Sequence, residues 1–497
     1  SRHKGTCYAA AGFTYLGDTS GWSRRHRDWE WNGQPKQVYV YPLHNHAREL
    51  LSGAATDRLM PEPFKQMTAT RKTTVIDEIE HLDLSSTERG LLDRITREVP
   101  DPRDPRGVRH HVATIIAVAA VGVLTGAKSF RAVGEVAAEL PERLLKRLQC
   151  RTQPDTDQRV APTESTIRRN LGRFDSDALD RCLSAWLVDE LAAGRLKPDG
   201  QLAAISVDGK WLRGTARTGA HQLKLFAAIT HGTTIVTGQV QVDDNSNETT
   251  AFQPLLNTLP PSNPPDNEPA DNTPPTGRLT DDGLSDDGLP DGNPGSDLQG
   301  TVITADATHT NTRNARLIVE RNGHYLLQVK KNQPKLHNAL TTLHTGSFGP
   351  EHETCDRGHG RIDRRWTSVA SAPPDLFPHA NLIVRTYRER CTLDDQTIST
   401  ETAWHITDLT PQQATTNQLA TLVRGHWEIE NKLHYVRDVT YQEDTSQTWS
   451  NNGPRAMATL RNLAISIFNL NGLTNIAQAT RHYARNINKT LDLLGIP

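Results

Sequence analysis

The chain has 497 residues, of which 35% are hydrophobic and 23% are charged, and its formal net charge is −2. This length allows two to four domains or one elaborated core. It contains no apolar run of the ~18 residues that a membrane span needs, and the longest candidate, Val112 to Leu124, predicts a buried helix instead. Nothing at its start resembles an export signal.

The five cysteines are scattered and include no C-x-x-C pair. This pattern argues against a disulfide framework or a zinc ribbon, and it favours a reducing cytoplasm.

The net charge hides an asymmetry along the chain. Residues 257–300 hold nine Asp or Glu and one Arg, a local charge of −8, which leaves +6 for the remainder. A mildly basic remainder permits a nucleic-acid partner. The acidic segment itself is rich in Pro, Gly and Asp, so we predict a disordered loop insertion. An acidic regulatory or DNA-mimicking role is the alternative.

Residues 1–75 show no sustained periodicity, and the first methionine is Met60. We interpret this stretch as a poorly ordered or atypical extension, or as a misassigned start. Residues 76–195 predict an N-terminal helical domain, including LSSTERGLLDRI, KSFRAVGEVAAEL and the capped basic helix TESTIRRNLGRF. Two interpretations stay open for that basic helix: a DNA-contacting helix-turn-helix, or a bundle that braces the main domain.

From Gln201 the pattern becomes β-rich. Three strand-like runs, QLAAISVDG, LKLFAAIT and TTIVTGQVQVD, precede a short helix, TTAFQPLLNTL. After the acidic segment, TVITADA, a helix and HYLLQVKKNQP predict a right-handed crossover with parallel strands. Residues 335–410 predict a β-rich insertion, and a long helical stretch follows it. MATLRNLAISIFNL is interpreted as the last helix, before a tail at 476–497.

Three carboxylates stand out against this pattern. Asp208 and Asp306 each end a β-rich run, and Glu430 lies on a predicted helix with His426 and His434 on nearby turns. Phosphodiester cleavage needs an activated water and a stabilised leaving oxygen, which two Mg²⁺ ions about 3.5–4 Å apart can supply. Mg²⁺ prefers oxygen ligands, so a few carboxylates from different elements suffice.

An ordered series of motifs resembles the DDE transposases of bacterial insertion sequences, of the H-repeat-associated type. The resemblance covers most of residues 98–470. The matching stretches are VPDPRDPRGVRHHVATIIAVAAVGVLTGAKSFRAVGE, ISVDGKWLRG, SNETTAF, TADATHT, VKKNQP, RGHGRIDRR, HWEIENKLHYVRDVTYQED and GPRAMATLRNLA.

The resemblance implies an α/β fold, with an RNase H-like mixed sheet flanked by helices in a catalytic domain at 196–475. It also implies two Mg²⁺ or Mn²⁺ ions held by the catalytic residues Asp208, Asp306 and Glu430. Related transposases carry a Tyr, Arg, Glu, Lys signature around this Glu. Here those flanking positions are Val423, His426 and Arg437, so only Arg437 keeps a cation there.

Alternatives remain for several residues. Glu428 or Asp438 could replace Glu430, and Trp211 and Trp427 are interpreted as core aromatics rather than base-stacking residues. Basic and histidine side chains along the motifs are expected to contact DNA, mainly at backbone phosphates. These expected DNA contacts are Lys210, His309, Lys330, Lys331, Arg361, His426 and Arg437. His309 could instead orient a ligand or simply begin a helix, and Arg361 could be a solvated side chain in a tight turn.

The expected function is DNA transposition by a homodimer that acts on paired element ends and target DNA. Two alternatives differ in class. A nuclease with the same core would cleave without joining strands, and a defunct or domesticated relative would only bind DNA.

Overall fold

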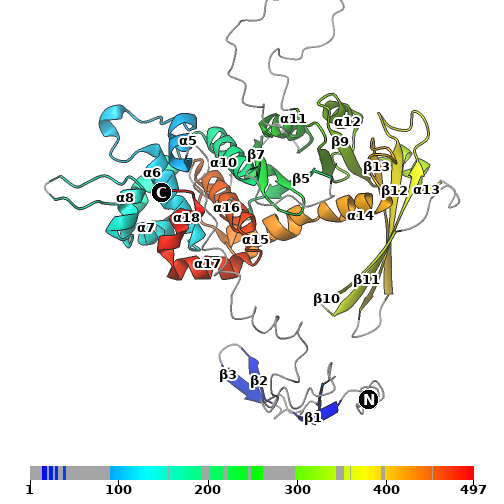
Figure 1. The fold of residues 1–497 in the computed structure, drawn as a ribbon, viewed down its shortest axis with the longest axis horizontal. Coiled ribbons are helices and arrows are strands. Elements are labelled where there is room, and N and C mark those ends of the chain that lie inside the picture. The colour runs from blue at the N-terminus through cyan, green and yellow to red at the C-terminus, as the bar shows by residue number, and fades with distance from the viewer. Residues whose placement is uncertain are drawn as a thin grey trace, which may run out of the picture. The chain divides into compact units, whose positions relative to one another are not determined.

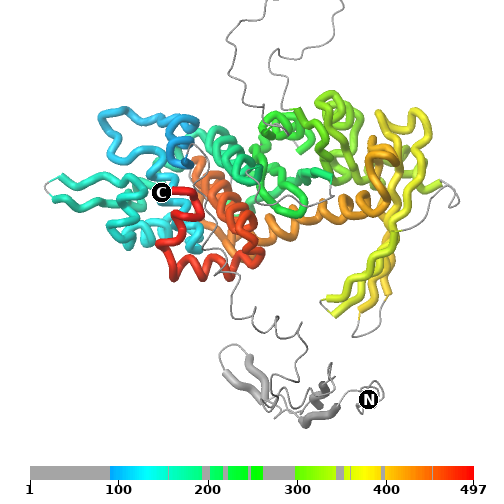
Figure 2. The backbone as a smooth tube through the Cα atoms, viewed as in Figure 1, coloured from blue at the N-terminus to red at the C-terminus, as the bar shows by residue number. Residues whose placement is uncertain are grey.

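A computed structural model describes residues 90–154, 156–192, 202–215, 222–243, 248–260, 297–342, 352–358, 360–392, 398–449 and 451–496, together with four short strands before residue 41 (Figures 1 and 2). The chain divides into two compact units, Ser1–Leu82 and Asp83–Pro497. The acidic segment that we predicted to be disordered lies almost entirely outside the described residues.

Two small antiparallel pairs of strands form the described part of the first unit. Strand β1 (Thr14–Asp18) pairs with β4 (Gln37–Val40), and β2 (Trp22–Arg25) pairs with β3 (Asp28–Trp31). The predicted extension at 1–75 therefore contains local β-structure.

A nine-stranded sheet organises the second unit, in the order β10-β11-β12-β13-β9-β8-β5-β6-β7 (Figure 1). Strand β6 pairs antiparallel with both β5 and β7, whereas β8 pairs parallel with both β5 and β9, as predicted for the strands around Asp306. These five strands are β5 (Ala204–Trp211), β6 (Lys224–Thr230), β7 (Val236–Val242), β8 (Val302–Ala305) and β9 (His324–Val329).

The β-rich stretch expected at 335–410 continues this same sheet. Its four strands pair antiparallel with one another, and β13 also pairs antiparallel with β9, which connects them to the other five strands. They are β10 (His352–Gly358), β11 (Arg361–Ser371), β12 (Leu382–Thr392) and β13 (Ile398–Thr407). The sequence did not predict β10, because this edge strand, HETCDRG, is polar and lacks apolar alternation. Helix α13 (Pro334–Thr341) was also missed.

Helices cover both faces of the sheet. Helices α11 (Glu248–Thr258) and α12 (Thr312–Val319) pack on one face, around Phe226 and Tyr325. Helix α14 (Thr416–Gly425) packs on the other face, where its Leu419 joins a buried cluster with strand residues. A short π-helical segment, η8 (Ile429–His434), leads from α14 into α15 (Tyr435–Val439).

The helices of residues 91–190 share one hydrophobic core with the C-terminal helices, and this core extends to residues of β6 and β7. Helix α6 is buried at all thirteen positions, as predicted from its sequence. The earlier helical elements are α5 (Leu91–Glu98), η4 (Pro105–Gly107), α6 (Val112–Leu124), α7 (Phe130–Ala138), α8 (Glu142–Arg147), α9 (Glu164–Leu171) and α10 (Ser176–Glu190).

The interpretation of MATLRNLAISIFNL as the last helix was wrong. This segment lies in α16 (Gly453–Leu470), and two further helices follow it, where the sequence reading placed a tail. The tail forms helices because Ile476, Tyr483 and Leu491 bury apolar surface in the shared core. The remaining elements are η6 (Arg213–Thr215), η9 (Glu443–Thr445), α17 (Ile476–Arg485), η10 (Ile487–Lys489) and α18 (Thr490–Leu493).

Among the described residues, no helix is both long and apolar enough to cross a membrane.

Candidate active site

The parallel pairing of β5 and β8 places two aspartates side by side. Val207 of β5 is opposite Ala305 of β8, and the next residue on each strand is an aspartate, Asp208 or Asp306. The prediction that both end their strands holds only for Asp306. Strand β5 runs on to Trp211, because its hairpin with β6 continues beyond the point where β8 ends.

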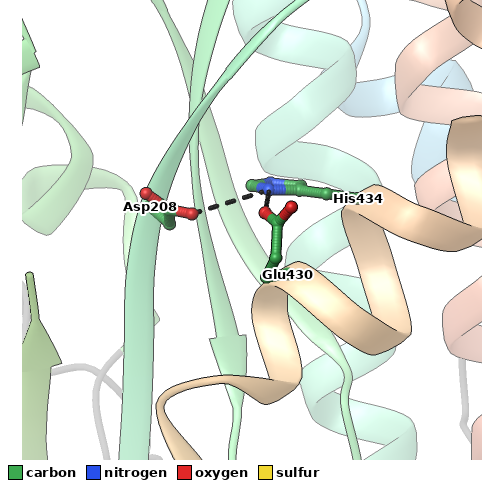
Figure 3. A group of neighbouring side chains, drawn as sticks. All are labelled: Asp208, Glu430 and His434. Carbon is green, nitrogen blue, oxygen red and sulfur yellow. Dashed lines mark hydrogen bonds and ion pairs between the residues drawn. The ribbon is translucent and has the colours of Figure 1, made fainter. Parts of the chain in front are cut away.

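Glu430 reaches the same place from the π-helical segment η8. Figure 3 shows Glu430 and His434 directed from this segment toward Asp208 on its strand. The His434 Nδ1 atom lies 3.1 Å from Glu430 Oε2 and 3.6 Å from Asp208 Oδ2. One donor atom from each of the three residues falls within 4.8 Å of the others. π-Helical turns are rare and are frequently found at functional sites.

The electrostatics of this group suit a cation. Burial raises the pKa of Asp208 to about 7, and the nearby charges of Asp306, Glu248 and Glu430 act in the same direction. The hydrogen bond from His434 lowers the pKa of Glu430. Crowded carboxylates with one pKa raised are mutually repulsive, and a bound cation would relieve that repulsion.

Buried hydrogen bonds anchor the segment that carries Glu430. His426 Nδ1 is 3.1 Å from Thr304 Oγ1 on β8, and the His231 ring is hydrogen-bonded to both Thr304 and Ser206. A Cβ atom on Gly425 would lie 2.2 Å from His231 Nδ1, so the helix can approach this ring only with glycine there. His426, expected to contact DNA, therefore fixes the helix to the sheet.

The two alternatives to Glu430 have other partners. Glu428 accepts hydrogen bonds from the Gly232 backbone at 2.6 Å and from Lys432 at 2.5 Å. Asp438 forms an ion pair with Lys210 at 2.6 Å. The geometry therefore favours Glu430 as the third carboxylate.

The expected DNA contacts divide into exposed and buried side chains. Lys330 and Lys331 are exposed at the end of β9, and Arg361 is 40% exposed beside Asp363. Three other members are buried against protein partners and offer little surface to a phosphate, whereas His426 is half-buried in its contact with Thr304. These buried members are Lys210 in its pair with Asp438, His309 between aromatic rings, and Arg437 in its pair with Glu443.

The interpretation of Trp211 and Trp427 as core aromatics was wrong. Trp211 is 49% exposed and Trp427 is 61% exposed, and Tyr435, two turns along the same helical stretch as Trp427, is 60% exposed. Trp427 precedes Glu430 by three residues, and Trp211 follows Asp208 by three. Exposed aromatic rings therefore lie close in sequence to both carboxylates.

A buried ion pair fixes α15 to α16. Glu443 accepts hydrogen bonds from Arg437 at 2.8 Å and from Arg461 at 2.7 Å, and none of the three side chains is more than 1% exposed. Although burial alone would raise the pKa of Glu443, the two guanidinium groups lower it to about 2.

One carboxylate near the site was not predicted from the sequence. Glu248, the first residue of α11, lies 3.0 Å from Lys224 Nζ and 3.7 Å from His309 Nε2. Although burial alone would raise the pKa of Glu248, the contacts with His309 and Lys224 lower it. The only signal in the sequence was its place within the SNETTAF motif. The contact of His434 with Glu430 was also not predicted. The four-residue spacing of the two residues, which places them on one side of a helix, could have indicated it.

Two aspartates at neighbouring central strands and a glutamate from a helical segment define a candidate metal-dependent phosphodiester site. The comparisons with known proteins agree with this class. Residues 197–467 match the family described as "Transposase DDE domain", and residues 94–187 match its companion, "DDE_Tnp_1-associated". The chain therefore belongs to the DDE transposase family, whose members cleave DNA and transfer strands.

The relatives of this chain carry related names. The Escherichia coli O157:H7 protein named "Putative transposase YncI" is 25% identical over 394 residues, which cover 76% of this chain and 86% of that protein. The E. coli K12 protein named "H repeat-associated putative transposase YhhI" is 25% identical over 391 residues, covering 74% and 88%. A solved piggyBac transposase complex aligns with 82% of this chain and 78% of that chain, at 9% identity and a TM-score of 0.33.

Proposed function

We propose that this protein is a DNA transposase that cleaves the ends of an insertion sequence and joins them to target DNA. The observation that carries the proposal is the convergence of Asp208 and Glu430, from strand and helix, beside the Asp306 position. The strand order and directions of β7-β6-β5-β8-β9 support an RNase H-like core, to which β10–β13 add an extension.

We propose Asp208, Asp306 and Glu430 as the ligands of divalent cations, Mg²⁺ or Mn²⁺. The group fits such ions because its oxygen donors are hard and crowded, and because burial of Asp208 makes an unneutralised charge costly. Two cations held there would supply positive charge for an attacking water and for the departing oxygen.

The protein groups would orient the reactants. His434 donates to Glu430 and so holds that carboxylate toward Asp208, while Lys210 forms an ion pair with Asp438. Hydrolysis and strand transfer are both in-line displacements at phosphorus, so one site serves first a water and then a DNA 3′-hydroxyl. This chemistry requires no covalent intermediate with the protein.

The exposed groups near the site suit a nucleic acid. Lys330 and Lys331 offer charge to backbone phosphates, and Trp427 and Tyr435 offer faces on which unpaired bases can stack. Two protomers on paired ends would let both ends be cut together.

The test uses the full chain and a plasmid that carries the DNA flanking its gene. We expect cleavage and joined products with Mg²⁺ and none with a chelator. Asp208→Asn, Asp306→Asn and Glu430→Gln should each abolish cleavage while DNA binding persists. Cleavage without joined product would favour the nuclease alternative. DNA binding without cleavage by the unmodified chain would favour the defunct relative.

A further inference from the structure

The carboxylate of Glu248 lies against the strand that carries Asp208, although Glu248 belongs to a helix on the opposite face of the sheet from α14. A Cβ atom on Gly209, the residue after Asp208, would lie 2.1 Å from Glu248 Oε1. The Glu248 carboxylate can therefore approach the strand this closely only because Gly209 has no side chain. Lys224 holds Glu248 in place at 3.0 Å, and its ammonium group also lies 4.7 Å from the centre of the Trp211 ring.

His309 connects Glu248 with the aspartate pair. Its ring is 0% exposed and stacks on Phe226, with ring centres 4.7 Å apart, while the Phe252 ring lies at 5.4 Å. Within the described part of the chain, neither ring nitrogen has a partner at hydrogen-bond distance. The Nε2 atom faces two carboxylates instead, at 3.7 Å from Glu248 and 4.0 Å from Asp306.

This arrangement is costly unless it serves the site. A fully buried imidazole without hydrogen bonds loses its solvation, and apolar packing alone would favour a third phenylalanine at this position. The stacked rings hold the plane of His309, and in this orientation its Nε2 atom faces the gap between Glu248 and Asp306. Among the described residues, the hydrogen bonds to the Asp306 carboxylate come from the backbone and hydroxyl groups of Thr308, in the same turn.

We propose that Glu248 and His309 are positioning residues for Asp306: Glu248 fixes the His309 ring, and the Nε2 atom of that ring sets the direction of the Asp306 carboxylate for metal binding. This inference rests on the proposed function, since it assigns the metal-binding role to Asp306. Loss of an outer partner of a metal ligand typically lowers metal affinity about 10- to 100-fold.

The experiment measures Mn²⁺ binding to the full chain by the loss of the free-ion EPR signal, and then DNA cleavage as a function of Mg²⁺. Glu248→Gln should weaken Mn²⁺ binding about tenfold. It should raise the Mg²⁺ concentration for half-maximal cleavage by a similar factor, and DNA binding should not change. Glu139→Gln, at an exposed position at the end of α7, is the matched control and should behave as the unmodified chain.

His309→Phe keeps the aromatic stack and removes only the ring nitrogens, so it tests the same contact in a variant that retains the packing. It should reproduce the effect of Glu248→Gln, and the double variant should be no worse than either single one. Metal dependence unchanged in either single variant, or effects that add in the double variant, would overturn the positioning role. If Asp208→Asn abolishes cleavage while these variants behave normally, the proposed function stands and only this inference fails.

Discussion

His434 and Glu430 lie four residues apart on the π-helical segment, and the imidazole Nδ1 atom is 3.1 Å from the glutamate Oε2 atom. The same nitrogen lies 3.6 Å from Asp208, so one buried ring faces carboxylates from a helix and from a strand. This contact gives Glu430 a fixed direction that its exposed position alone would not.

Replacing His434 should therefore impair the site without removing a carboxylate. We expect His434→Gln to lower metal affinity about 10- to 100-fold, because the orienting donor to Glu430 is displaced. Cleavage rates measured over a range of Mg²⁺ concentrations check this, and a high Mn²⁺ concentration should restore part of the rate. A rate equal to that of the unmodified chain at low Mg²⁺ would contradict the role of His434.

A side chain at Gly209 should disturb the site from the other face. Its Cβ atom would lie 2.1 Å from Glu248 Oε1, so Gly209→Ala must displace the carboxylate or the strand. We expect a loss of about 1–3 kcal/mol in the free energy of unfolding, together with reduced cleavage. Gly107→Ala is the control, since a Cβ there meets nothing within 4 Å. Urea unfolding of both variants makes the comparison.

Glu443 should matter for stability rather than for chemistry. Glu443→Gln leaves Arg437 and Arg461 buried without their shared counter-charge, and removal of one partner of a buried pair costs about 3–5 kcal/mol. Glu139→Gln, in an exposed position, should cost almost nothing. Equal urea midpoints for the two variants would show that the buried pair contributes little.

Stability should also fall as the solution is acidified below neutral pH. Burial lowers the pKa of His231 to about 3, of His405 to about 3 and of His426 to about 4, against an ordinary value of 6.5. The unfolded chain therefore binds more protons between these values, so the free energy of unfolding declines as pH falls through that window. Glu443 adds a loss only at lower pH, between its ordinary 4.5 and about 2.

Urea unfolding at about pH 7 and about pH 5 is compared between the unmodified chain and a His231 variant. The comparison is needed because Asp208, whose pKa burial raises to about 7, contributes a change of opposite sign over this range in both chains. We expect His231→Gln to reduce the change in unfolding free energy between these two conditions, whatever its effect at neutral pH. The exposed His379 provides the control, as His379→Asn should leave the pH dependence intact. A pH dependence unaltered by His231→Gln would count against a neutral buried ring.

Trp427 should contribute to DNA affinity. Its exposed ring lies three residues before Glu430, and stacking of one base on an aromatic ring is worth about 1–3 kcal/mol. We expect Trp427→Ala to weaken binding to DNA with unpaired ends roughly tenfold, while Mn²⁺ binding is retained. Ile398→Ala, at an exposed position on β13, should leave affinity unchanged. Fluorescence anisotropy with labelled DNA makes the measurement.

Local sequence patterns, within single helices and strands, predicted much of this architecture. The uniformly apolar α6 could only be a buried helix, and the β-rich runs before Asp208 and Asp306 gave neighbouring parallel strands. Glu430 was singled out by its motif and by the carboxylates it had to meet.

The features that the sequence did not predict depend on contacts between segments that lie far apart in the chain. A charged residue such as Arg437 is normally exposed, and its burial depends on Glu443 in a separate turn and on Arg461 in another helix. The approach of Glu248 depends on a missing side chain at Gly209, 39 positions earlier, as the residue numbers show. Trp427 carries no local signal that separates an exposed ring from a core one.

The core that joins α6 to α16, α17 and α18 has a consequence for synthesis on the ribosome. Helix α6 emerges early, yet the helices that cover it are translated last, so its apolar surface stays uncovered until the final tenth of the chain is made. A gene copy interrupted before Gly453 would encode all three carboxylates and still leave that surface bare. Such a product should aggregate or be degraded, so even a late stop codon would silence the gene.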